Sequence, residues 1–348
     1  MALQAALPVA WFGGKARVAP EVWTALGDVG NYIEPFAGSL GVLLNRPHEP
    51  RIETVDDADG WIVNFWRAVQ QAPDDVADHA IWPVTEIDLL ARHRWLCERD
   101  RKTEFLRRME ADPDYFDAQI AGWWVWGICA WIGSGWCAGW WDGEHGTGRG
   151  IERLKLPHLG NTGQGVNRQL PHLGNTGQVV NRQLPHLGDA GRGVNRPMDP
   201  NGTREYIHAL AARLRRVRVC CGDWSRIVTD GAMAYGSTIG VFLDPPYDQD
   251  IREAALYSVD EKGISKRVAE WAFAHGDDPR LRIVLCGYEG EHEVPSTWRT
   301  IAYSAGRAYG RHDSETPNCE NRHKERLWLS PGCGEPIGQT IDLFGGGW

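Results

Sequence analysis

The sequence predicts an α/β fold with an open, Rossmann-like sheet that a long insertion interrupts. Two segments predict the sheet. Residues 239–243 (IGVFL) form an apolar run typical of a short buried strand, and two prolines end it directly after Asp244. Residues 32–44 have the pattern of a strand, a glycine-bearing turn and a helix, which brings backbone N–H groups close to a ligand.

A second strand is predicted at residues 51–55. It runs into the acidic pair Asp56-Asp57, roughly 20 residues after Pro35, where nucleoside-binding sheets place the carboxylate that holds ribose hydroxyls. The glycine turn lacks the dinucleotide spacing G-x-G-x-x-G, so it assigns no ligand by itself. Three further elements are expected: an amphipathic helix at 203–216 and strands at 216–220 and 282–286.

Asp244 is the most informative candidate side chain. The end of a strand is where open α/β sheets bind ligands. The carboxylate and the carbonyl of Pro245 can each accept one N–H of an exocyclic amine on a planar base, while Tyr247 stacks on its ring. The alternative is a strand that ends in a proline turn with a solvated aspartate.

Composition limits the function without choosing one. The 348 residues suit one sizeable domain with a substantial insertion. No leader-like apolar segment follows Met1 and no apolar run is long enough to span a membrane, so a soluble, cytoplasmic protein is expected. The eight cysteines contain no C-x-x-C pair, which indicates neither a disulfide framework nor a zinc site, and no metal is expected.

The net charge of −9 argues against nucleic acid, but the basic residues are clustered. Between His145 and Cys220, twelve Lys and Arg stand against four Asp and Glu, a local charge of +8 that leaves −17 on the rest of the chain. A basic insertion on an acidic body is typical of a DNA-binding segment. A solvated loop is the alternative.

The insertion also contains a repeat with a period of 14 residues. Copies begin at Leu156, Leu170 and Leu184, and each ends in Val-Asn-Arg. The repeat predicts either a stack of short strands that presents Arg168, Arg182 and Arg196 to DNA phosphates, or an expanded loop without fixed structure.

A tryptophan-rich run precedes the repeat. Residues 122–141 include seven of the 18 tryptophans. Exposed aromatic faces stack on unpaired bases. Large aromatic side chains are, however, more often part of a core.

Five stretches carry a resemblance: 11–15 (WFGGK), 34–38 (EPFAG), 55–64, 221–224 (CGDW) and 244–247 (DPPY). In type and order they resemble the Dam-like family of DNA adenine-N6 methyltransferases. The resemblance implies a class I methyltransferase sheet formed by residues 1–118 and 203–330. It also implies an inserted target-recognition region at 119–202 and a flexible tail at 331–348.

The resemblance further implies an activity. A methyl group passes from S-adenosylmethionine to N6 of an adenine flipped out of double-stranded DNA. The enzyme is expected to be site-specific, of the restriction-modification type and monomeric, in a bacterial or phage-type host cell. Alternatives are a cytosine-N4 methyltransferase, an RNA methyltransferase and a catalytically inactive DNA-binding relative.

Site residues follow from the family pattern. The catalytic group falls on Asp244, Pro245, Pro246 and Tyr247. Cofactor contacts fall on Trp11, Lys15, Glu34, Pro35, Phe36, Gly38, Asp57, Asp223 and Asp244. Two departures stand out. Asp57 is followed by Ala58-Asp59 where the family has Ile-Asn, so Asp56 remains a rival at the ribose, and Leu40 stands where the family turn has its second glycine.

Overall fold

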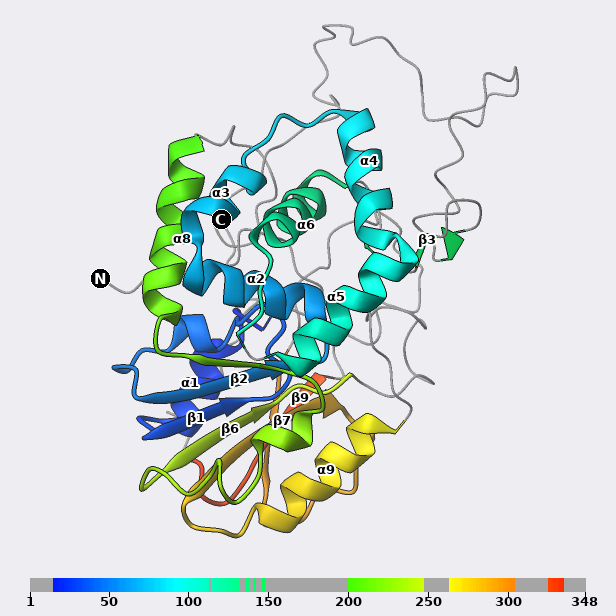
Figure 1. The fold of residues 1–348 in the computed structure, drawn as a ribbon. Helices are drawn as coiled ribbons and strands as arrows, with labels where there is room; N and C mark the ends of the chain where they lie inside the picture. Colours follow the sequence, from blue (N-terminus) through cyan, green and yellow to red (C-terminus); the bar gives the residue numbers. More distant parts are fainter. Residues whose placement is uncertain are drawn as a thin grey trace, which may run out of the picture. The chain divides into compact units, whose positions relative to one another are not determined.

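A computed structural model describes residues 15–112, 114–131, 136–137, 140–141, 146–147, 200–246, 263–303 and 325–334 (Figure 1). The described residues fall into two compact units. A sheet unit lies within Trp11–Asp59 and Arg216–Trp348, and a helical unit lies within Gly60–Arg215. Among all the described residues, no helix combines the length and the apolar composition that a membrane span requires.

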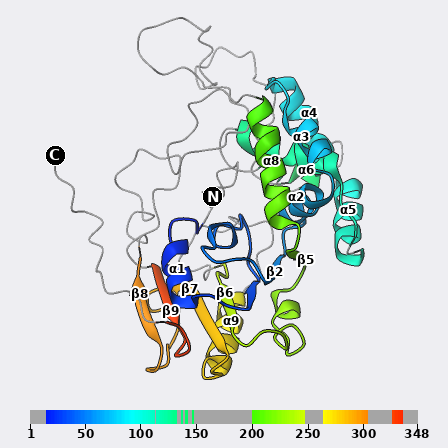
Figure 2. The same cartoon turned by 90° about the vertical axis from the view of Figure 1, so that its left-hand side faces the viewer.

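The sheet unit is built on seven strands in the order β5-β2-β1-β6-β7-β9-β8. Their bounds are β1 (Asn31–Glu34), β2 (Ile52–Asp57), β5 (Arg218–Cys221), β6 (Ile239–Leu243), β7 (Leu281–Tyr288), β8 (Arg299–Ala302) and β9 (Glu325–Leu329). The first five strands of that order pair in parallel, whereas β9 is antiparallel to both β7 and β8. Figure 2 shows β8 and β9 toward one edge of the sheet and β5 at the other. The expected α/β fold with a mostly parallel sheet is therefore confirmed.

Helices cover both faces of this sheet. Trp23 of α1 (Ala19–Leu26) packs on Tyr32 of β1 with ring centroids 4.8 Å apart. Ile33, the next residue of β1, points to the other face and belongs to a core cluster with Val268 of α9 (Ile264–His275). With both faces covered, every residue of β1 and β6 is buried, as the apolar run at 239–243 predicts.

One expected element of the sheet unit is much reduced. The helix predicted after the turn at 34–38 is only a single 3₁₀ turn, η1 (Leu43–Asn45). Pro47 disfavours helical geometry at the preceding Arg46, and the buried Leu40 has a left-handed backbone that no helix continues from. A second short 3₁₀ helix, η2 (Trp224–Ile227), follows β5.

The start of the expected flexible tail is ordered. Of residues 331–348, the described ones (331–334) pack on the sheet unit. The Cys333 thiol donates to the Ile283 carbonyl at 3.4 Å, and the Gly334 N–H donates to the Ala25 carbonyl at 2.8 Å. These bonds hold the chain against β7 and the end of α1.

The helical unit is a set of packed helices with a two-stranded ribbon. Its elements are α2 (Gly60–Gln71), α3 (Pro73–Ala80), α4 (Glu86–Cys97), α5 (Arg99–Ala111), α6 (Ala118–Ala130), α8 (Pro200–Leu214), β3 (Trp140–Trp141) and β4 (Gly146–Thr147). Helix α6 contacts α2, α3 and α4, and Figure 1 shows it in the middle of these helices. Trp124 and Trp126 of α6 are buried, so these two tryptophans are core residues and not exposed stacking platforms.

The unit boundaries differ from the expected domains. Division was expected at 118/119 and 202/203, but the helical unit begins at Gly60 and ends at Arg215. The reason is packing: α2 and α3 contact both α6 and α8, so the segments on each side of the insertion join it in one core.

Candidate active site

Four parallel strands of the sheet unit end in or are followed by an acidic residue at the carboxyl end of the sheet. Glu34 ends β1, Asp57 ends β2, Asp223 follows β5 and Asp244 follows β6. Parallel strands place their carboxyl ends together. Because β1 and β6 are neighbours whose next strands lie on opposite sides, Glu34 and Asp244 flank the topological switch point, where open sheets bind ligands.

Lys15 forms an ion pair with Asp244 at the carboxyl end of the sheet. Its Nζ lies 2.9 Å from Asp244 Oδ2, and the two side chains are only 12% and 16% exposed. Burial lowers the pKa of Lys15, but the charge of Asp244 and the contributions of neighbouring ionisable groups outweigh it and leave that pKa well above its usual value. Lys15 is therefore a fixed cation, and it holds the Asp244 carboxylate in place.

Gly41, which has no side chain, allows the backbone of Lys15 and Ala16 to pack directly against it. A Cβ at Gly41 would lie 2.8 Å from Ala16 N and 3.2 Å from Lys15 N, and both of these are backbone atoms. The Lys15 carbonyl then accepts from Val18 N at 3.2 Å as the chain enters α1. A glycine just after the β1 turn thus fixes where the lysine stands.

Three more ionisable side chains surround this ion pair. Cys286 of β7, Tyr303 after β8 and Glu325 of β9 all act electrostatically on Lys15. Burial raises the pKa of Cys286 and of Tyr303 well above their usual values, so both groups are neutral at physiological pH. The sequence gives no local signal for this group, because strand pairing alone brings the three segments together.

Glu34 is a buried carboxyl group beside the switch point. Tyr32 donates its hydroxyl to Glu34 Oε2 at 3.0 Å, and Glu34 is 2% exposed. Burial raises the pKa of Glu34 to about 8, although the bonds from Tyr32 and from the Leu43 backbone lower it. The negative charge of Asp244 adds to the rise. Glu34 is therefore mostly protonated at pH 7.

The turn after β1 has a left-handed backbone at two positions. Gly38 has φ 42° and Leu40 has φ 56°. A non-glycine residue in this region costs roughly 1–2 kcal/mol, and here the fully buried Leu40 side chain offsets that cost. The turn thus keeps its shape without the second glycine.

Asp57 is bound to this turn, which distinguishes it from Asp56. Gly38 N donates to Asp57 Oδ2 and Asp59 N donates to Oδ1, each at 2.8 Å. Burial, followed by the charge of Asp59, raises the pKa of Asp57 to about 7. Asp56 alternates with it along β2, so it points to the opposite face and is 1% exposed. Of the two, Asp57 lies on the side of the turn.

Asp223 lies beside aromatic side chains. Its Oδ1 accepts from Ser225 N at 2.9 Å, and Arg267 Nη2 lies 3.5 Å from Oδ2. The Ser225 hydroxyl also donates to Oδ1, and this bond is the main reason that the pKa of Asp223 is below its usual value. Trp224, the next residue, lies 6.2 Å from the Phe36 ring, so two rings border the β1 and β5 ends.

Some predicted site residues have a described position and others do not. Lys15, Glu34, Pro35, Phe36, Gly38, Asp57, Asp223, Asp244, Pro245 and Pro246 all belong to the sheet unit. Trp11, Tyr247, Arg168, Arg182 and Arg196 lie outside the described residues. Sequence reasoning missed Trp224, although it stands in the stretch 221–224, and it missed Gly41.

Comparison with known proteins adds no relative. A scan against protein-family models finds no match to this chain, and a search of curated proteins finds none either.

Proposed function

We propose that the sheet unit is an S-adenosylmethionine-dependent methyltransferase that methylates N6 of adenine in DNA. One observation carries the proposal: Asp244-Pro245-Pro246 follows β6 at the switch point of a sheet whose strands, counted along the chain, run 3-2-1-4-5-7-6. The dinucleotide-binding order is 3-2-1-4-5-6. The class I methyltransferase sheet differs from the dinucleotide-binding sheet by one additional strand. That strand lies between strands 5 and 6 and is antiparallel to both, as β9 is here.

The residues at the strand ends fit the cofactor. Asp57 has its carboxylate fixed by two backbone N–H groups, and each oxygen keeps a second lone pair for a ribose hydroxyl. Phe36, which is only partly buried, offers an apolar ring for an adenine. Glu34 is a protonated acid in a buried place, and a ligand ammonium beside it would favour its ionised form. The three parts match a nucleoside that carries an amino-acid group.

Asp244 and Pro245 act on the methyl acceptor. S-adenosylmethionine, when bound, supplies a methyl group on a positively charged sulfur. The lone pair of an adenine N6 is delocalised into the ring, which makes it a poor nucleophile. The Asp244 carboxylate and the Pro245 carbonyl each accept one N–H of that amine, which favours a pyramidal nitrogen and stabilises the positive charge that develops on it. The chain thus contributes positioning and electrostatics, with no covalent enzyme intermediate.

Lys15 keeps Asp244 suited to this role. The ammonium group lies 2.9 Å from one carboxylate oxygen and occupies it, which leaves the remaining lone pairs of Asp244 for an incoming amine.

DNA is proposed as the substrate because of a cluster of basic residues, and a duplex substrate imposes one further step. The target nitrogen of a paired adenine is inaccessible in a duplex, so the base must flip out at a cost of a few kcal/mol. The excess of twelve basic over four acidic residues between His145 and Cys220 supplies the phosphate attraction that the acidic remainder lacks.

The test identifies the methylated product. DNA from a host that lacks base methylation is incubated with the protein and methyl-labelled S-adenosylmethionine, then digested to nucleosides. We expect labelled N6-methyladenine. Labelled N4-methylcytosine, label in RNA alone, or binding of DNA without any transfer would each replace the proposal by the corresponding alternative. Asp230→Ala, at an exposed position of the same unit, serves as the matched control for active-site variants.

A further inference from the structure

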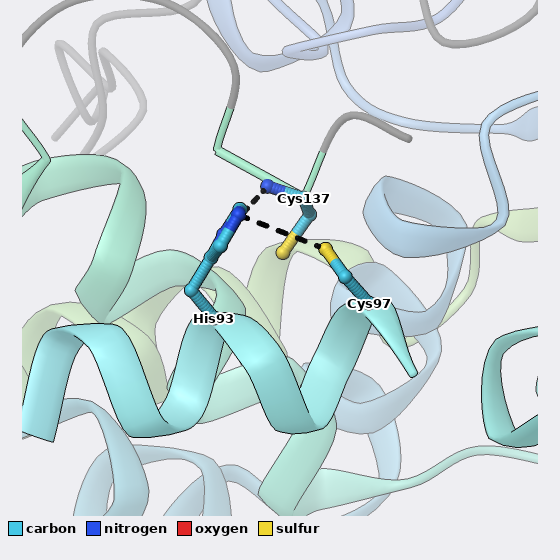
Figure 3. Close-up of side chains that lie close together, drawn as sticks. All are labelled: His93, Cys97 and Cys137. Carbon is cyan, nitrogen blue, oxygen red and sulfur yellow. Dashed lines mark hydrogen bonds between the residues drawn. The ribbon is translucent and has the colours of Figure 1, made fainter. Parts of the chain in front are cut away.

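A cluster of ligand-type side chains belongs to the helical unit and includes none of the strand-end residues described above. His93 and Cys97 lie four residues apart on α4 and so share one face of the helix. Cys137 follows α6 in the chain. One ligand atom from each residue lies within 4.8 Å of the other two, and Figure 3 shows the three side chains directed toward one another.

The cluster is buried. His93 and Cys97 have no exposed surface, and Cys137 is 3% exposed. Two aromatic rings cover the imidazole: Trp131 stacks on His93 with centroids 4.7 Å apart, and Trp136 lies at 5.1 Å. The three ligand-type groups are therefore closed off from solvent.

The distances suit a small thiophilic cation. Cys97 Sγ lies 4.0 Å from His93 Nε2. Tetrahedral zinc, with Zn–S of about 2.3 Å and Zn–N of about 2.0 Å, places its sulfur and nitrogen ligands roughly 3.5 Å apart. Binding therefore requires Cys97 Sγ and His93 Nε2 to approach each other by about half an ångström.

Charge balance favours the same occupant. Two thiolates and a neutral imidazole neutralise one divalent cation, so the loaded site carries no net charge into the core. A thiolate is the form that binds metal.

The two ring nitrogens of His93 have different neighbours. Cys137 N donates to Nδ1 at 3.4 Å, while Nε2 faces Cys97. Coordination through Nε2 places the ring proton on Nδ1, so metal binding would replace the 3.4 Å contact from Cys137 N.

We propose that His93, Cys97 and Cys137 form a structural Zn²⁺ site with three protein ligands and a water at the fourth position. Thiolate and imidazole ligands select zinc over Mg²⁺ and Ca²⁺. The site would fix residues 136–137 to α4, and it stands whether or not the sheet unit transfers methyl groups.

The test measures metal in the full chain. Protein purified under a thiol reductant is dialysed against a weak chelator, and its zinc is counted by elemental analysis. We expect about one zinc per chain, falling below about one tenth in Cys97→Ser and in Cys137→Ser. Cys129→Ser, which changes a thiol of α6 outside the cluster, should keep its zinc.

Spectroscopy on the unchanged protein covers the case in which the variants do not fold. Cobalt substitution should give thiolate-to-metal charge transfer and tetrahedral d–d bands, and absorption at the zinc edge should show two sulfur ligands and at least one nitrogen. A wild-type chain without zinc and without cobalt bands would overturn the proposal. A Cys97–Cys137 disulfide that persists under the reductant would do the same.

Discussion

Replacing Lys15 with methionine removes the cation that lies 2.9 Å from the Asp244 carboxylate. At that distance and an effective dielectric constant of about 20, two unit charges attract by about 6 kcal/mol. Desolvation of both groups opposes this attraction, and side-chain exposures of 12% and 16% screen it further. We therefore expect a coupling free energy of about 2–4 kcal/mol between the two side chains.

A double-mutant cycle with Lys15→Met and Asp244→Asn measures this coupling. The free energy of unfolding is determined by urea denaturation for all four proteins. Each single variant should lose more stability than the double variant, because each leaves one charge without its counterpart. Lys266→Met is the matched control: its side chain is 80% exposed, so it should change stability by less than about 0.5 kcal/mol.

The pH dependence has a definite sign. The pKa of Lys15 is raised in the folded state, so its contribution is complete below its unfolded pKa of about 10.4 and is lost only as the pH rises beyond that value. The coupling should therefore be the same at pH 6 and pH 9 to within about 0.5 kcal/mol. A coupling below about 0.5 kcal/mol at pH 7 would show that the ion pair is not formed and that Lys15 does not hold Asp244.

Three further predictions address the cofactor, the protonated acid and the DNA contact. The pKa of Glu34 is raised to about 8, so the folded state binds one more proton than the unfolded state and the free energy of unfolding falls as the pH rises from about 4.5 to 8. In urea titrations across this range, Glu34→Gln should reduce this pH dependence. An unchanged pH dependence would contradict burial of the acid. Asp57→Ala should weaken S-adenosylmethionine binding by about 1.5–3 kcal/mol in calorimetry, whereas Asp56→Ala should have much less effect, and the reverse order would move the ribose contact to Asp56. Replacing Arg168, Arg182 and Arg196 by Gln should make the slope of log K against log salt shallower by roughly 2.7 for duplex DNA, with sequence preference little changed; an unchanged slope would leave the expanded-loop interpretation of the repeat.

The central strand β6 could be predicted because it is an apolar run with a definite end. Residues 239–243 match β6 to the residue, since the run stops at two prolines that cannot continue a strand. β8 gave no such signal: it has four residues, alternates between half-buried and exposed, and among the described strands pairs only with β9. Edge strands take their structure from the neighbour more than from their own sequence.

Part of the candidate site could also be predicted. Acidic residues at strand ends are visible in the sequence once the strands are assigned, so Glu34, Asp57, Asp223 and Asp244 were found. Lys15 was named as a cofactor contact, but its ion pair with Asp244 depends on the packing of Gly41 against the backbone before α1, which no local pattern reveals.

The His93 cluster shows the same limit in the helical unit. The four-residue spacing of His93 and Cys97 is a readable helical pattern, yet it became a possible ligand pair only when tertiary packing brought Cys137 to it. Cysteine spacing alone therefore missed a cluster that spans a helix and a distant loop.

Methyl transfer by the Asp244→Ala variant tests the central claim most directly. Under single-turnover conditions with labelled S-adenosylmethionine and unmethylated DNA, the wild-type chain should form N6-methyladenine. The variant should lose more than tenfold in rate, a barrier increase above about 1.4 kcal/mol, while Asp230→Ala keeps the wild-type rate. Circular dichroism should show the same fold in all three proteins. A variant that keeps more than about a tenth of the wild-type rate, or a wild-type chain that transfers no methyl group to adenine, would contradict the account.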